Sequence, residues 1–117
     1  MIRQLSLAVA ASLLGAGIAS AEDAALVEKG KKVYDAATPK CKVCHSIGGV
    51  GNAKGALDDV GSTLSAADLK AWVRTPKEMT AKAKADRKPP MMAYPKEKLS
   101  DEDLDALAAY LLTLKKK

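Results

Sequence analysis

The feature that most constrains this chain is the pentad Cys41-Lys42-Val43-Cys44-His45. This spacing suits covalent attachment of a c-type haem, in which two thiols bond to the haem vinyl groups and the adjacent histidine ligates the iron. The chain has two cysteines and one histidine, and all three lie in the pentad. The pentad therefore predicts one covalently bound haem c that uses every cysteine and histidine of the chain.

Three other interpretations of the cysteine pair fit less well. A thioredoxin-like redox pair belongs beside a βαβ pattern, and none is visible in the sequence. A structural zinc site wants four cysteine or histidine ligands, whereas the chain offers three. A simple disulfide explains the two cysteines but leaves the adjacent His45 to chance. Haem attachment accounts for all three residues.

The N-terminal residues 1–21 have the pattern of a cleaved secretory signal peptide. Arg3 supplies a positive charge, residues 5–18 form an uncharged apolar run, and Ala19-Ser20-Ala21 fits an A-x-A cleavage site. The run is shorter than the roughly 18–20 residues that span a bilayer. We expect cleavage after Ala21, one domain over residues 22–117, and no stable membrane insertion. Haem attachment needs both cysteines as thiols outside the cytoplasm, which points to a bacterial periplasm.

Composition agrees with a bound haem and bears on possible partners. The chain has no phenylalanine, one tryptophan and three tyrosines, so a haem would supply the large apolar body that the core lacks. The formal net charge of +5 favours attraction to an acidic partner, although a solvated surface of mixed charge is the alternative. Export and the lack of interleaved aromatic residues argue against nucleic-acid binding.

Hydrophobic spacing predicts an all-α fold. Helices are expected over residues 24–36, from a capping box at Ser65, over residues 76–85, and from an N-cap at Ser100. Residues 46–61 and 88–95 are expected to form loops, the first rich in glycine and the second in proline. Gly30 inside the first helix costs about 1 kcal/mol relative to alanine. A close helix crossing would explain that cost, and simple tolerance is the alternative.

The second axial position of the iron remains open to several ligands. A single histidine excludes bis-histidine ligation within this chain, which leaves a methionine, a lysine, a tyrosine or an open site. After signal cleavage the methionines are Met79, Met91 and Met92. Because prolines stiffen residues 88–95, this loop is suited to hold the sulfur of Met91 or Met92 over the iron. Packing in the core is the ordinary alternative for a methionine.

Taken together, these residues resemble a class I cytochrome c of the small bacterial monohaem type, over essentially all of residues 22–117. The resemblance implies three to five helices wrapped around one haem, with an N-terminal helix crossing a C-terminal one. Gly30 and Tyr34 would then meet Ala109-Tyr110-Leu111. In this family the ligand loop often reads Met-Pro-x-aromatic, and Met91-Met92-Ala93-Tyr94 matches it apart from the proline. The resemblance therefore implies Met91 as the axial ligand, with Met92 as the alternative.

Two further expectations follow from the resemblance. Members commonly have Gly-Pro-x-Leu after the haem motif, with the proline carbonyl accepting a hydrogen bond from the ligand histidine. Here the stretch is Gly55-Ala56-Leu57, so another backbone carbonyl would have to serve. Trp72 stands where relatives place an aromatic residue near the haem, either bonded to a propionate or packed in the core.

The function implied is that of a soluble periplasmic one-electron carrier, not an enzyme. A haem with both axial positions filled by protein cannot easily bind a substrate, which leaves electron transfer through the haem edge. The expected partners are an oxidase, dehydrogenase or reductase, whose acidic docking surface would face Lys40, Lys42 and Lys54 of a monomer. The alternatives are a haem-bearing subunit of a periplasmic redox enzyme, or a haem gas sensor with a displaceable methionine.

Overall fold

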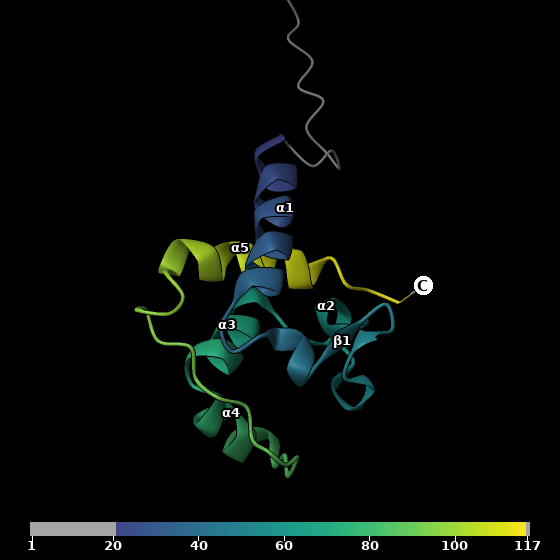
Figure 1. Ribbon diagram of the computed structural model, residues 1–117, viewed down its shortest axis with the longest axis vertical. Coiled ribbons are helices and arrows are strands. Elements are labelled where there is room, and N and C mark those ends of the chain that lie inside the picture. The colour runs from purple at the N-terminus through teal and green to yellow at the C-terminus, as the bar shows by residue number, and fades with distance from the viewer. Residues whose placement is uncertain (1–20, 117) are drawn as a thin grey trace, which may run out of the picture.

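The computed structural model describes residues 21–116, so the predicted signal peptide lies outside the described residues apart from Ala21. Within this range the α-helices are α1 (Ala21–Ala36), α2 (Val60–Thr63), α3 (Ala66–Arg74), α4 (Pro76–Ala83) and α5 (Asp101–Leu112). Short 3₁₀ turns, η1 (Cys41–Val43) and η2 (Ala53–Gly55), and the two-residue strands β1 (Ser46–Ile47) and β2 (Val50–Gly51) complete the fold (Figure 1). The prediction of an all-α class is confirmed.

The N- and C-terminal helices cross at close range. Figure 1 shows α1 lying across α5, and Gly30 is buried at the crossing. A Cβ atom on Gly30 would lie 1.9 Å from the Ala106 carbonyl oxygen, so only glycine lets the helices approach this far. Tyr34 packs edge-on against Tyr110, with ring centroids 6.2 Å apart. The close crossing explains why a glycine stands inside this helix. The helix α1 begins at Ala21 rather than at residue 24, where the sequence predicts its start.

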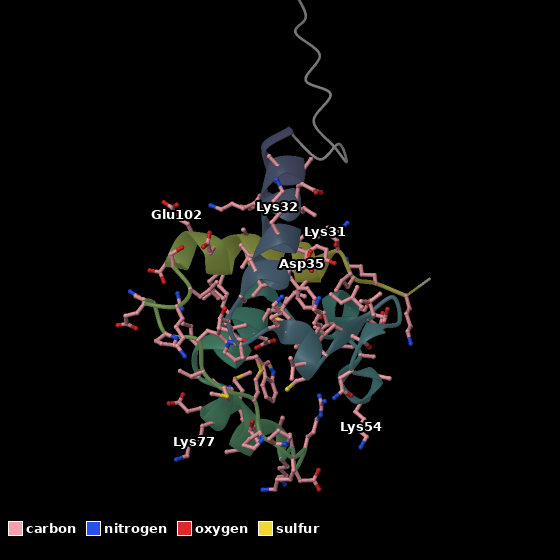
Figure 2. The ribbon with its side chains drawn as sticks, in the orientation of Figure 1. Lys31, Lys32, Asp35, Lys54, Lys77 and Glu102 are labelled. Atoms are coloured by element: carbon pink, nitrogen blue, oxygen red, sulfur yellow. The ribbon has the colours of Figure 1, made fainter. Side chains whose placement is uncertain are left out.

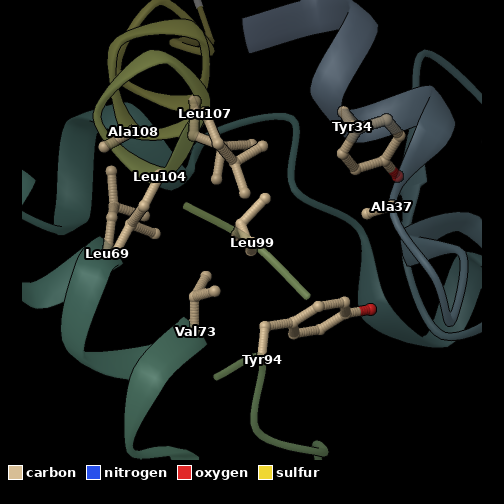
Figure 3. Packing of buried hydrophobic residues seen from close by; sticks show 10 residues of the cluster. Tyr34, Ala37, Leu69, Val73, Tyr94, Leu99, Leu104, Leu107 and Ala108 are labelled. Atoms are coloured by element: carbon tan, nitrogen blue, oxygen red, sulfur yellow. The ribbon is translucent and has the colours of Figure 1, made fainter. Parts of the chain in front are cut away.

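The hydrophobic core lies between α5, α3 and the chain segment that leads into α5. The predicted stripe of α5 is buried along its whole length, and Leu69 and Val73 of α3 face it (Figure 3). Leu99 lies between Leu107 on one side and Tyr94 on the other. This cluster fixes the positions of α3 and of Tyr94, the two features that border the site described below.

Local sequence signals set where the helices begin. Ser65 and Asp68 form the predicted capping box, in which each side chain accepts a hydrogen bond from the other residue's backbone N–H. The Ser100 hydroxyl accepts from the Asp103 N–H at the start of α5. Pro76 opens α4, but the helix ends at Ala83 rather than at residue 85, because Lys84 takes a left-handed conformation with φ 52°.

The predicted loop over residues 46–61 contains more regular structure than expected. β1 and β2 pair antiparallel, and Gly48 and Gly49 between them have φ values of 57° and 82°. Two consecutive positive φ angles are what a tight two-residue hairpin turn requires. The sequence pattern does not predict this hairpin, because strands of two residues are too short to show alternation.

Among residues 21–116, no helix is long and apolar enough to cross a bilayer.

Candidate haem site

One cavity brings together the attachment cysteines, the ligand histidine and the two methionines that the sequence favours for the haem. It has a volume of about 390 Å³ and its walls are largely aliphatic side chains from α2, α3, α5 and the chain around them. The residues that line it include all five predicted site residues, namely Cys41, Cys44, His45, Met91 and Met92. Figure 2 shows sulfur atoms gathered between α4 and the elements above it. Residues about 50 positions apart in the sequence thus border one space.

The pentad is held in a tight turn. The N–H groups of Cys44 and His45 both donate to the Cys41 carbonyl oxygen, at 3.1 and 2.9 Å. This turn, η1, brings both cysteines and the imidazole to the cavity wall. Both cysteines are half-buried and no disulfide joins them, so both sulfur atoms fit attachment to the haem vinyl groups.

Hydrogen bonding fixes which nitrogen of His45 faces a ligand. Nδ1 lies 2.9 Å from the Gly55 carbonyl oxygen. A carbonyl can only accept, so Nδ1 donates and Nε2 keeps its lone pair. Burial is the main cause that lowers the pKa of His45 and the nearby Arg87 charge adds to it, while the Gly55 bond opposes them. The neutral imidazole is the form that ligates iron.

Gly55 provides the backbone carbonyl that the sequence pattern does not identify. Its own position also requires glycine, because a Cβ there would lie 2.1 Å from Nη1 of Arg87 and 2.2 Å from the Cys44 carbonyl oxygen. Arg87 donates from Nη2 to that same Cys44 oxygen at 2.6 Å. Nothing in the sequence pattern signals the Arg87 contact, since 43 residues separate the two partners.

The methionine segment is anchored through Tyr94. The Tyr94 N–H donates to the Val73 carbonyl at 2.9 Å, and Arg74 donates to the Tyr94 carbonyl at 2.7 Å. The Tyr94 hydroxyl donates to the Pro39 carbonyl, just before the pentad. Burial raises the pKa of Tyr94, which keeps this donor protonated. Tyr94 therefore ties the methionine segment to α3 and to the approach to η1.

The three methionines differ in their surroundings. Met91 is partly buried and packs against the core cluster, whereas Met92 is 61% exposed, and both border the cavity. Met79 lies in α4 and is not among the residues that line the cavity. Within the described residues, the structure thus keeps Met91 and Met92 as candidates at the site.

The remaining predicted residues separate into those at the cavity and those beside it. Trp72 lines the cavity and is not part of the buried cluster, which favours a place near the haem over a core role. Lys40 lies at the cavity rim and is exposed. Lys42 and Lys54 are exposed but do not line the cavity, and Figure 2 shows Lys54 pointing outward.

The residues present fit a haem c. Two thiols, an imidazole with a free Nε2 and a pair of thioethers surround one apolar space, and these are the bonding and ligating groups of such a site. Comparison with known proteins agrees, because residues 27–115 match the family model described as Cytochrome c. The chain belongs to the cytochrome c family. Members of this family carry covalently attached haem c and transfer electrons with it, and Cys41 and Cys44 fit their attachment motif.

The chain is also similar to part of a longer protein. The chain is 33% identical over 99 residues to cytochrome c oxidase subunit 2 of Alkalihalophilus pseudofirmus, a match that covers 77% of this chain and 26% of that protein. The chain thus spans about a quarter of the length of that relative. The comparison with solved structures found no match.

Proposed function

We propose that this chain is a periplasmic one-electron carrier, not an enzyme, whose haem iron is held by His45 and Met91. Haem c bound at this site supplies an iron that gains or loses one electron. The observation that carries the proposal is that one apolar cavity is bordered both by Cys41, Cys44 and His45 of the pentad and by the methionine pair. With imidazole and thioether both bound, the protein would leave no open position for a substrate.

Met91 is the better supported of the two methionines. It packs against the core cluster beside Tyr94, whose backbone is hydrogen-bonded to α3. A ligand that holds a low-spin iron needs such a rigid support. Met92 is 61% exposed and is the more loosely held of the two. The family pattern described above also aligns Met91 with the ligand position.

The test is the ferric optical spectrum of protein matured with haem in a bacterial periplasm. Intact mass of the same material should give a chain that begins at Glu22 and carries one haem. The matched pair Met91→Leu and Met92→Leu removes one thioether at a time with little change of volume. We expect Met91→Leu alone to abolish the weak far-red band of the methionine–iron bond and to lower the reduction potential.

Three other results would change the proposed ligand or the proposed function. Loss of the band in Met92→Leu alone would move the ligand one residue along, and a wild-type protein without the band would refute His/Met ligation. Rapid and complete carbon monoxide binding by the reduced wild-type protein would favour a gas sensor.

A second candidate function is a haem-bearing subunit of a periplasmic redox enzyme. The likeness to part of an oxidase subunit 2 favours it, because that relative is named as a piece of an enzyme complex. Purification from the native source discriminates the two. A free carrier elutes alone as a monomer, whereas a subunit stays with the same companion chains through successive columns.

Docking of a free carrier would rest on charge. The formal net charge is +5, and loss of Arg3 with the predicted signal peptide leaves +4. This charge, with exposed Lys40 just before the pentad and exposed Lys42 within it, supports brief, steered encounters with an acidic partner surface. Redox encounters of this kind use small interfaces.

A further inference from the structure

The chain between α4 and Tyr94 has few attachments to the rest of the protein. Residues 86–93 contain no helix or strand, and the side chains of residues 86–90 are all exposed. Among the described residues, one hydrogen bond involves this stretch, and it is the bond from Nη2 of Arg87 to the Cys44 carbonyl oxygen at 2.6 Å. Because the stretch carries both candidate methionines, this bond bears directly on where their sulfur atoms lie.

The partner of Arg87 belongs to the haem-attachment motif. Cys44 is the second thiol of the pentad, and Nη1 of Arg87 lies where a side chain on Gly55 would begin. Gly55 is in turn the acceptor for Nδ1 of His45. The guanidinium therefore contacts the turn that holds the histidine, while its own backbone lies four residues before Met91. A charged donor makes this bond stronger than a neutral one.

We propose that Arg87 is a positioning residue that fastens the methionine segment to the haem-attachment motif and thereby keeps the axial methionine in place. This inference rests on the methionine ligation proposed above. Arg87 fixes the segment at its start and Tyr94 fixes it at its end. Pro89 and Pro90 between them limit the freedom of the span. Without Arg87 the segment keeps the packing of Met91 on the core cluster and the hydrogen bonds of Tyr94, but it loses its bond to the attachment motif, and the methionine is released more easily.

Imidazole binding to the ferric holoprotein tests the inference, because imidazole must displace the methionine to reach the iron. We expect Arg87→Gln to raise the imidazole affinity about tenfold, the scale of one lost bond from a charged donor. Lys88→Gln is the matched control, since it removes the same charge from the next, exposed residue. We expect its affinity to stay within about twofold of wild type, as is usual for exposed positions.

Arg87→Lys separates position from charge. Its ammonium keeps the charge but ends one atom short of Nη2, so we expect its imidazole affinity to rise as well. Wild-type affinity in Arg87→Lys together with raised affinity in Arg87→Gln would mean that charge alone acts, and would overturn a positioning role. If Arg87→Gln does not accumulate as holoprotein, the comparison of Arg87→Lys with Lys88→Gln decides.

The wild-type spectrum keeps this inference distinct from the proposed function. A missing methionine–iron band in the wild type would overturn the ligation itself and the inference with it. A band that is present, combined with unchanged imidazole affinity in Arg87→Gln, would overturn the role of Arg87 alone.

Discussion

Gly30→Ala tests the helix crossing on which the fold depends. An added Cβ would lie 1.9 Å from the Ala106 carbonyl oxygen and 2.7 Å from the Cβ of Tyr110. Ordinary contact between carbon atoms is about 3.5–4.0 Å, so α1 and α5 must separate by roughly an ångström or more. The nearest atom is backbone and cannot rotate away. The edge-on contact of Tyr34 with Tyr110 would loosen as the helices part.

Two opposing effects set the size of the loss. Alanine favours a helix interior by about 1 kcal/mol over glycine. Overpacking costs about 1–3 kcal/mol and occasionally more, and a clash with rigid backbone belongs at or beyond the upper end of that range. The expected net loss is therefore about 2 kcal/mol in the free energy of unfolding. For a domain of this size, that corresponds to a fall of about 8–16 °C in Tm.

Guanidinium unfolding of the holoprotein, followed by circular dichroism, measures this loss. Ala25→Gly is the control, because Ala25 is exposed in the same helix and the change affects helix propensity without a clash. We expect the control to lose about 1 kcal/mol. A Gly30→Ala protein as stable as wild type, or more stable, would refute the argument that the crossing requires glycine.

Two further predictions concern charge and pH. We expect electron transfer to an acidic partner to slow as salt rises, and Lys42→Glu within the pentad to slow it more than Lys31→Glu, which alters an exposed position of α1 ten residues before the pentad. Rates that do not respond to salt would contradict steering by charge. Burial raises the pKa of Tyr34 to about 12 from 10.0. Above pH 10 the unfolded state loses this proton first, so stability falls between pH 10 and about 12. Unfolding at pH 9 and pH 11 should show a smaller fall in Tyr34→Phe, and an equal fall in both proteins would exclude this cause.

Local features of the sequence predicted local structure well. The pentad places its three chemical groups within five consecutive residues, so any tight turn brings them together. Ser65 and Ser100 each accept from a backbone N–H three residues away, which is why their caps could be predicted. The buried stripe of α5 follows from helical spacing alone.

Contacts between distant residues could not be predicted in the same way. Every residue has a carbonyl, so no pattern identified Gly55 as the acceptor for His45. The bond from Arg87 to Cys44 joins residues 43 positions apart, and α2, α3 and α4 lie between them in the sequence. Hairpins with two-residue strands carry too little alternation to be recognised.

The choice between Met91 and Met92 illustrates the same limit at the centre of the site. Both side chains are thioethers, and one position along the chain is the only difference that the sequence shows. The structure fixes the position of the methionine segment along the cavity, because Arg87 is hydrogen-bonded to Cys44 before the pair and Tyr94 to Val73 after it. Sliding the segment by one residue to exchange the two sulfurs would break one or both of these contacts. The hydrogen bonds of Arg87 and Tyr94 therefore determine which of the two methionines can reach the iron. The Arg87 variants test whether the first of these bonds holds the segment in place, and the methionine variants test which sulfur that placement selects.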